Sequence, residues 1–282
     1  MDRKVIYSII FILILVNSFI WWEILFFGPS QNTEIYALDV GQGDSELVVL
    51  PGSVKILIDG GPNNKILSQL NQIFRPTDLY VDLVIMSHPQ TDHFIGLIDV
   101  LKRYKVGAFI SSGKSGPAQS FEDLVKTING NRIPAVVLGE GDKIKYAENR
   151  LDILSPSQAL LQSAEPNDWA LVMKLISNGA KTLFTGDIDE KIEKTLAQRY
   201  DLDVDILKVS HHGSKFSSSE DFLKTATPKI ALIEVGKNSY GHPTPQVLNQ
   251  LASIGSQIFR TDKDGMIKLV IGNSKIDIFT QK

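Results

Sequence analysis

The most restrictive feature of the sequence is an apolar run near its start, from Val5 to Phe27. Its polar interruptions are few: Ser8, Asn17, Ser18 and Glu23. A helix of this length crosses a hydrocarbon core of about 30 Å, because each residue adds about 1.5 Å. The run therefore divides the chain in two. We expect residues 1–30 to form a cytoplasmic stub and a transmembrane anchor, and residues 31–282 to form one domain with a sizeable core.

The charges that flank this run predict its orientation. Arg3 and Lys4 precede it, and the next charges are Glu23 and Glu34. By the positive-inside rule, the N-terminus lies in the cytoplasm and the domain formed by residues 31–282 is extracytoplasmic, on a single-pass protein of the cell membrane. A secreted chain with a cleaved signal peptide is the alternative, since a basic start and an apolar centre fit both. The run is long for a signal peptide and lacks a small-residue cleavage site, which favours the anchor.

Residues 31–282 alternate between strand and helix patterns, without a repeat or an internal boundary. Short β-branched runs predict strands over Glu34–Val40, Ser45–Leu50, Val54–Ile58, Val81–Met86, Ala108–Ser111, Leu151–Leu154, Trp169–Ile176, Thr182–Thr185, Val204–Val209, Ile230–Val235, Gln257–Arg260, Met266–Ile271 and Ile276–Phe279. Helical spacing of apolar residues predicts helices over Lys65–Phe74, Phe94–Tyr104, Phe121–Ile128, Asp189–Gln198, Ser219–Thr225 and Gln246–Ile254. Two β-rich halves, each with helices, predict a four-layer αββα sandwich.

All five histidines occur just beyond a predicted strand or in a turn-rich loop: His88, His93, His211, His212 and His242. A packed core histidine would instead lie inside an apolar run. The loop from His88 to His93 supplies two imidazoles and a carboxylate directly after one strand, and Asp187 follows another. Since strand ends in one sheet lie side by side, these loops are expected to meet at one site. The chain has no cysteine, so the donors are nitrogen and oxygen, which suits zinc, manganese or iron.

Each of these residues also has a purely structural interpretation. Asp92 would cap the helix that starts near Phe94, and Asp187 would cap the helix that starts near Asp189. The pair His211-His212 would belong to a polar loop, and His242 to a turn between Gly241 and Pro243.

The ordered motifs resemble the metallo-β-lactamase superfamily, and in particular the hydrolase domain of the ComEC/Rec2-type DNA-uptake (competence) proteins. The resemblance covers about residues 34–270. It rests on Asp39-Val-Gly-Gln-Gly-Asp44, Ile58-Asp59-Gly60-Gly61, the His88–His93 loop, Thr185-Gly186-Asp187, Leu207-Lys-Val-Ser-His-His-Gly-Ser214, Tyr240-Gly241-His242-Pro243 and Arg260-Thr261-Asp262.

The resemblance implies metal ligands in two positions. His88 would bind the first ion, Asp92 and His93 the second, and Asp187 would bridge the two. A histidine of the pair His211-His212 would complete the second position; we favour His211, because it comes first after the strand.

The resemblance also implies supporting and catalytic roles. Asp59, with Asp44 beside it, would support the metal loop by hydrogen bonding. Asp92 or Asp187 would accept a proton from the attacking water, while His212 and His242 would lie near the phosphate or the leaving group.

Two departures from the family pattern weaken the first metal position. Gln90 stands where that branch has an aspartate, and a neutral amide is a poor ligand for a divalent ion. The third-motif histidine is missing, and the matching region is Asn167-Asp168-Trp169, where Asp168 or Asn167 would have to help. We therefore expect one tightly bound divalent metal, zinc or manganese, and a second that is weak or absent.

The predicted activity is a metal-dependent hydrolase, a phosphodiesterase or nuclease-like enzyme. The substrate follows from the resemblance alone: DNA or another phosphodiester, with a separate channel protein as a partner. The formal net charge of −3 and the lack of a Lys/Arg-rich run argue against tight DNA binding. A catalytically degenerate surface module that binds DNA or a partner protein is the alternative from another class. A hydrolase of another ester or amide is a further one.

Overall fold

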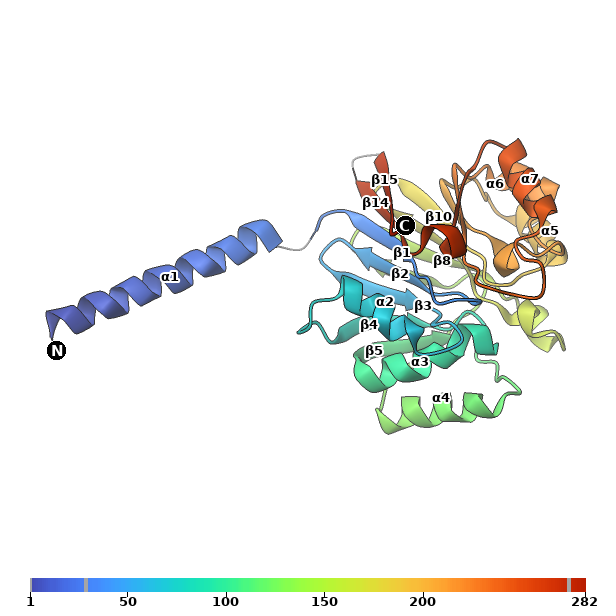
Figure 1. The fold of residues 1–282 in the computed structure, drawn as a ribbon. Coiled ribbons are helices and arrows are strands. Elements are labelled where there is room, and N and C mark those ends of the chain that lie inside the picture. Colours follow the sequence, from blue (N-terminus) through green and yellow to red (C-terminus); the bar gives the residue numbers. More distant parts are fainter. Residues whose placement is uncertain (1, 28–29, 273–274) are drawn as a thin grey trace.

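The N-terminal helix stands apart from the rest of the molecule (Figure 1). The computed structural model describes residues 2–27, 30–272 and 275–282. Helix α1 (Arg3–Phe27) is continuous over 25 residues. Within it, Arg3–Trp22 has a mean hydropathy of 2.2 and no buried residue, so this segment is long and apolar enough to cross a membrane.

The remaining strands form two sheets. The first runs in the order β15-β14-β1-β2-β3-β4-β5-β6. Its strands are β1 (Thr33–Ala37), β2 (Glu46–Leu50), β3 (Val54–Ile58), β4 (Tyr80–Ile85), β5 (Lys105–Ser111), β6 (Ala135–Val137), β14 (Ile267–Gly272) and β15 (Lys275–Thr280). The pairs from β3 to β6 are parallel, whereas those from β15 to β3 are antiparallel.

The second sheet runs in the order β13-β12-β11-β10-β9-β8-β7. Its strands are β7 (Lys143–Tyr146), β8 (Asn149–Ser155), β9 (Val172–Ser177), β10 (Ala180–Phe184), β11 (Ile206–Lys208), β12 (Ile230–Ile233) and β13 (Gln257–Arg260). The pairs from β10 to β13 are parallel.

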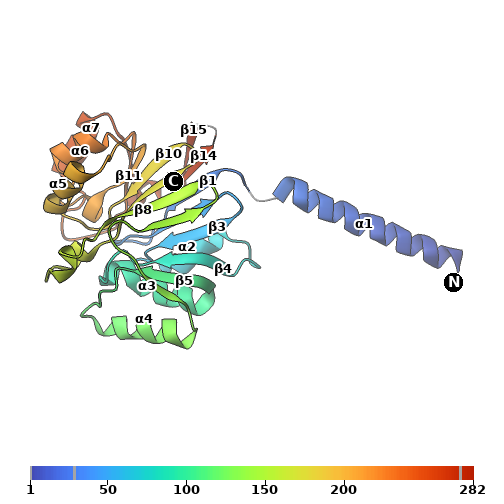
Figure 2. The same cartoon turned by 180° about the vertical axis from the view of Figure 1, so that it is seen from behind.

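Helices cover the outer face of each sheet (Figures 1 and 2). The first sheet carries α2 (Lys65–Ile73), α3 (Thr91–Arg103) and α4 (Gln119–Gly130). The second carries α5 (Glu190–Arg199), α6 (Glu220–Ala226) and α7 (Pro245–Ser253). Short connections are α8 (Thr261–Asp264) and the 3₁₀ turns η1 (Leu160–Gln162), η2 (Pro166–Trp169) and η3 (Ser210–Gly213).

Alternating side chains of each strand divide the apolar core into layers. In β3, Ile56 and Ile58 point into the space between the sheets, whereas Leu57 packs under the helices of the first sheet. Successive side chains on a strand face opposite sides, so one strand contributes to both clusters. A third cluster lies between the second sheet and its helices. The predicted four-layer αββα sandwich is confirmed.

The predicted elements match the structure closely, and the differences are informative. Helix α3 begins at Thr91, three residues before the predicted start, and so takes Asp92 and His93 into its first turn. Two short strands, β6 and β7, were not predicted. The residues of β6 are all exposed, so β6 lacks the apolar alternation that marks a half-buried strand.

Candidate metal centre

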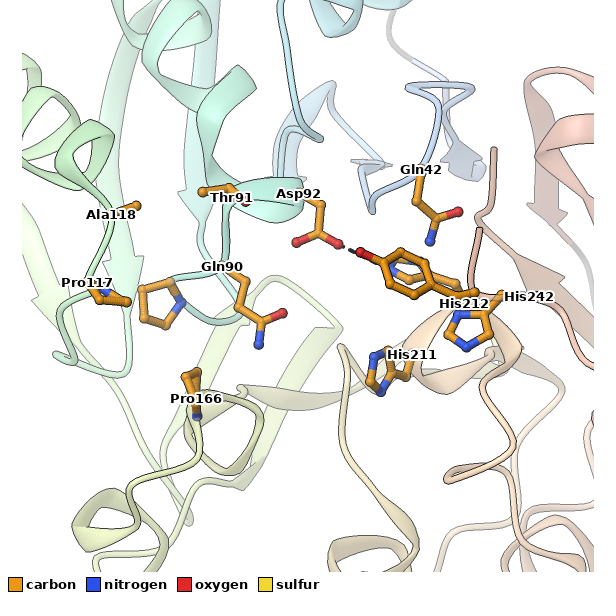
Figure 3. Close-up of a pocket in the computed structure, with 12 residues that line it drawn as sticks. Gln42, Gln90, Thr91, Asp92, Pro117, Ala118, Pro166, His211, His212 and His242 are labelled. Atoms are coloured by element: carbon orange, nitrogen blue, oxygen red, sulfur yellow. Dashed lines mark ion pairs between the residues drawn. The ribbon is translucent and has the colours of Figure 1, made fainter. Parts of the chain in front are cut away.

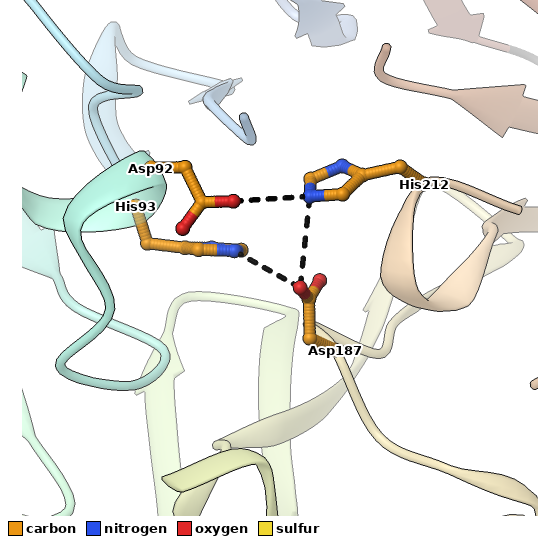
Figure 4. A group of neighbouring side chains, drawn as sticks. All are labelled: Asp92, His93, Asp187 and His212. Carbon is orange, nitrogen blue, oxygen red and sulfur yellow. Dashed lines mark ion pairs between the residues drawn. The ribbon is translucent and has the colours of Figure 1, made fainter. Parts of the chain in front are cut away.

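Four side chains from distant loops converge at one edge of the sandwich: Asp92, His93, Asp187 and His212 (Figure 4). Asp92 and His93 lie in the first turn of α3. Asp187 follows β10, and His212 lies in η3, after β11. Each offers one ligand atom, and all four atoms lie within 4.8 Å of one another.

The spacing of these atoms fits a single ion. His93 Nε2 lies 3.3 Å from Asp187 Oδ2, while His212 Nε2 lies 3.4 Å from Asp92 Oδ2 and 3.6 Å from Asp187 Oδ2. Ligand atoms about 2.0–2.2 Å from a tetrahedrally coordinated ion are about 3.3–3.6 Å apart. Both Nε2 atoms are buried without a hydrogen-bond partner, which an ion between them would supply.

The local backbone explains why these side chains are free to converge. The helix after Asp187 is capped by Asp189, whose carboxylate accepts from the backbone N–H groups of Lys191 and Ile192, so Asp187 has no capping role. His211 and His212 both have left-handed φ angles, 50° and 53°. Such a conformation is unusual for side chains other than glycine, and here it accompanies a turn that buries His212 in the cluster.

Asp59 and the Glu234 carbonyl oxygen orient the two imidazoles from behind by hydrogen bonds, and Asp44 lies close to the His212 ring. Asp59 Oδ2 lies 2.8 Å from His93 Nδ1, and its other oxygen accepts from the Ser87 backbone N–H. Asp44 Oδ1 lies 3.1 Å from His212 Nδ1, which is also 2.9 Å from the Glu234 carbonyl oxygen. A hydrogen bond at Nδ1 directs the Nε2 lone pair forward, which is how metal-ligating histidines are usually held.

A buried lysine, Lys208, stands behind the carboxylates. Its ammonium group forms an ion pair with Asp44 and lies 3.9 Å from Asp187 Oδ1. Burial lowers the pKa of Lys208, but Asp44 and Asp187 more than offset this and hold the pKa above its ordinary value. The side chain is therefore charged, and it anchors the two carboxylates that face the imidazoles.

Two buried glutamates complete this rear network. Burial, together with repulsion from Glu234 and Asp44, raises the pKa of Glu46 well above its usual range. Burial and Asp44 raise the pKa of Glu234 to about 7. These effects favour the protonated form of Glu46, which limits the negative charge gathered around Lys208.

The carboxylates of the cluster favour positive charge on the two imidazoles. Burial alone would lower the pKa of His212, yet Asp187 and Asp44 raise this pKa to about 10. The pKa of His93 is likewise raised, because Asp187 and Asp59 outweigh its burial. Although burial would raise the pKa of Asp187, His212 and His93 hold it well below its usual range. Two imidazolium protons thus balance the carboxylates, and a divalent cation would provide the same charge.

Some predicted site residues lie beside the cluster rather than in it. The His88 ring lies 4.1 Å from the His93 ring, centroid to centroid, and its buried Nε2 has no hydrogen-bond partner. Burial and His93 lower the pKa of His88 to about 3, so the ring is neutral. Gln90 donates through Nε2 to Asn167 Oδ1 at 2.6 Å. Asp168 lines a separate pocket and belongs to none of the metal-capable groups among the described residues.

The sequence-based preference for His211 as the ligand is not supported by the geometry. His211 Nε2 lies 3.8 Å from Asp187 Oδ2, but the residue is outside the group of four, and its side chain is 29% exposed. His212 occupies the inward position instead. The order of the two residues along the chain does not give the direction of their side chains, and both have left-handed φ angles.

Two members of the cluster, Asp92 and His212, line a cleft of about 610 Å³ (Figure 3). Of the four converging side chains, only Asp92 has appreciable exposure, at 32%. The residues that line the cleft are Gln42, Pro89, Gln90, Thr91, Asp92, Pro117, Ala118, Pro166, His211, His212, Tyr240 and His242. A ligand would therefore reach the cluster past Asp92, His211 and His242.

The sequence analysis did not identify three residues of the rear network, Lys208, Glu46 and Glu234. A pattern in the sequence could have indicated two of them. Lys208 and Glu234 each interrupt a run that is otherwise apolar, Ile206–Val209 and Ile230–Val235. A charged residue at a buried strand position is costly unless it is paired, so it indicates a polar network nearby.

The comparisons with protein families and sequences agree on one relationship. The model of the metallo-beta-lactamase superfamily matches residues 38–236. ComE operon protein 3 of Bacillus subtilis (strain 168) is 28% identical over 269 residues, 87% of this chain and 34% of its own length. Competence protein ComA of Neisseria gonorrhoeae is 28% identical over 255 residues, 88% of this chain and 34% of its own length. The chain thus spans about a third of these relatives.

Solved structures share the fold at low sequence identity. YhfI of Bacillus subtilis, a metallo-beta-lactamase fold protein, has a TM-score of 0.56 at 11% identity, covering 84% of this chain and 99% of that one. CmlA, a diiron beta-hydroxylase from Streptomyces venezuelae, has a TM-score of 0.57 at 12% identity, covering 86% of this chain and 54% of that one. These similarities concern the architecture alone.

Proposed function

This chain belongs to the metallo-beta-lactamase superfamily, and on that basis we propose that it is a membrane-anchored, metal-dependent phosphodiesterase with nuclease-like activity. The observation that carries the proposal is the group Asp92, His93, Asp187 and His212, of which Asp92 and His212 line an open cleft. Two imidazoles and two carboxylates form a donor set for zinc or manganese.

Different residues of the cleft have different roles in the proposed hydrolysis. When bound, a divalent ion lowers the pKa of a coordinated water and offsets negative charge in the transition state. Asp92 is the more exposed carboxylate of the group. Partial burial would raise its pKa, but His212 and His93 outweigh this effect and lower the pKa to about 2. It is therefore ionised and can accept a proton from the attacking water. His242 lines the cleft, where burial and His211 lower its pKa, so its neutral ring can donate a hydrogen bond to a phosphate oxygen.

The similar proteins favour a phosphodiester as the substrate. The relatives include competence proteins and "Recombination protein 2" of Haemophilus influenzae, and one structural relative with a TM-score of 0.52 is a diphosphatase. Departures from the two-ion pattern, at Gln90 and Asn167, disfavour a dizinc β-lactamase. The two side chains bond each other at 2.6 Å rather than facing an ion. We therefore propose one tightly bound ion in the group of four.

A non-catalytic module that binds DNA or a partner protein is the second candidate. The Gln90–Asn167 contact supports it, because it leaves His88 as the one imidazole in the first metal position. The two candidates differ in whether bound metal leads to turnover.

The test uses the full-length chain in detergent micelles with added manganese or zinc. We expect about one ion per chain by elemental analysis, and cleavage of bis-p-nitrophenyl phosphate. His212→Ala should lower metal affinity by more than about 100-fold, because loss of a ligand exceeds the 10–100-fold typical of outer-shell partners. It should abolish cleavage as well.

His211→Ala is the matched control, because it removes the neighbouring imidazole outside the group of four. It should keep one ion per chain. One bound ion without turnover in either metal would reject the phosphodiesterase and favour the module. Loss of metal in His211→Ala but not in His212→Ala would refute the ligand assignment.

A further inference from the structure

One wall of the cleft carries a series of rings in contact, of which Tyr240 and His242 are tilted towards each other and the inner contacts are edge-on. The Tyr240 ring lies 5.7 Å from the His242 ring, with an interplanar angle of 32°. The His242 ring lies 5.7 Å from that of His211, which in turn lies 6.1 Å from that of His212. The rings thus form a continuous series from the metal-binding group to the surface, where Tyr240 is 72% exposed.

The loop that carries the outer rings is held by a single side chain, Asn238. Its Oδ1 accepts from the backbone N–H groups of Tyr240 and His242, both at 3.1 Å. Its Nδ2 donates to the carbonyl oxygens of Gly236 and His242, both at 2.9 Å. An exposed aromatic ring on a loop fixed in this way is preorganised to receive a ligand, because little further ordering is needed on binding.

The opposite wall is apolar and uncharged. Pro89, Pro117, Ala118 and Pro166 line it, and none of the described residues that line the cleft is Lys or Arg. Affinity within the cleft therefore comes from the metal-binding group and from contact with flat or apolar surfaces, not from basic side chains.

We propose that the exposed Tyr240 ring, backed by the His242 ring, forms a stacking subsite for an unpaired nucleobase next to the scissile phosphodiester. This subsite rests on the proposed function and narrows its substrate to single-stranded nucleic acid. Every base has an aromatic face that can stack on such a ring, but in a duplex those faces are covered by neighbouring base pairs. Exposed Lys237, on the same loop, lies outside the cleft lining, where it can contact the backbone of a longer strand.

The experiment compares two substrates with the same phosphodiester backbone, using the full-length chain in detergent with manganese. One is a thymidine 12-mer and the other is a 12-mer of abasic tetrahydrofuran nucleotides. The readout is the ratio of kcat/KM for the base-bearing substrate to that for the abasic one. Stacking is worth about 5- to 150-fold per base, and Tyr240→Ala should lower the ratio by that factor.

Two control variants separate stacking from other effects. Tyr240→Phe keeps the ring and should keep the ratio, and Tyr146→Ala, which removes an exposed tyrosine on β7, should leave it unchanged. An unchanged ratio in Tyr240→Ala would overturn the subsite, as would equal losses on both substrates.

A binding measurement keeps this result distinct from failure of the proposed function. If the wild type cleaves neither 12-mer, the nuclease assignment fails, and fluorescence anisotropy with labelled 12-mers then decides the subsite. Weaker binding of the thymidine 12-mer by Tyr240→Ala, with binding of the abasic 12-mer unaltered, would support it. Equal binding by the wild type and Tyr240→Ala would reject it.

Discussion

The carboxylates and imidazoles of the candidate metal centre share one electrostatic problem. Asp92, Asp187, Asp44 and Asp59 gather around His93 and His212, and most of this group is buried. Charges out of water are costly unless they are compensated. Lys208 provides one permanent positive charge from behind, and the remaining demand is met by protons on the imidazoles or by a cation in front.

This balance predicts that metal binding expels protons. The pKa of His212 is raised from 6.5 to about 10, and that of His93 is also raised, so both rings are protonated at pH 7 in the metal-free protein. Ligation requires neutral rings. About two protons should therefore leave per ion at pH 7, and apparent affinity should increase as the pH rises from 7 towards 10.

Isothermal titration calorimetry in buffers of different ionisation enthalpy measures the number of protons released. The variant Asp59→Asn serves as a comparison, since it removes one carboxylate that raises the pKa of His93, and it should release fewer protons. An affinity that is constant or falls over this pH range would contradict the charge balance.

At the scale of the elements, the centre depends on where parallel strands end. β4, β10 and β11 lead directly into the loops that carry His88, Asp187 and His212. The N-terminus of α3 is fixed against the loop after β3: the Gly60 N–H donates to the His93 carbonyl oxygen, and the Gly96 N–H donates to that of Gly61. This close approach fixes the positions of Asp92 and His93 at the start of α3.

The contact between Gly96 and Gly60 leaves no space for a side chain. A Cβ at Gly96 would lie 2.0 Å from the Gly60 carbonyl oxygen. Gly96→Ala should therefore destabilise the domain by about 1–3 kcal/mol, measured by urea denaturation, and should weaken metal binding by displacing Asp92 and His93.

Gly130→Ala, at the end of α4, is the control, because a Cβ there meets nothing within 4 Å. It should be neutral or stabilise by up to about 1 kcal/mol, since alanine favours helix over glycine. Equal stability of the two variants would show that α3 does not depend on this contact.

The whole molecule joins an apolar helix to a domain whose cleft lies beyond the first strand. The chain enters the domain at β1, which runs from Thr33 to Ala37, and the segment after β1 leads to Gln42 in the cleft wall. The cleft therefore lies at the end of the first sheet opposite the point where the chain arrives from α1. We propose that α1, which is long and apolar enough to cross a membrane, anchors this domain to a bilayer.

Expression in a bacterial host tests this arrangement. The full-length chain should remain in the membrane fraction after carbonate extraction, whereas residues 31–282 should be soluble, because α1 carries the continuous apolar surface. Protease added to intact spheroplasts should digest the domain, with a cytoplasmic protein as the protected control. Recovery of the full-length chain in the soluble fraction would contradict the anchor.

The sequence by itself determined the elements and the type of chemistry. The apolar helix, the strands with their period-two alternation and the placement of every histidine beyond a strand are local properties, encoded within a few neighbouring residues. They were sufficient for the four-layer fold and for the proposal that loops after β4, β10 and β11 meet.

Only the tertiary structure decided which side chains face the centre. His212 is buried in the group of four whereas His211 is 29% exposed, and Asp168 lines a different pocket although Pro166 in the same turn lines the cleft. Lys208 lies next to the centre because β11, which carries it, pairs with β10 in the second sheet. Such directions depend on contacts between residues far apart in the chain, which no local pattern encodes.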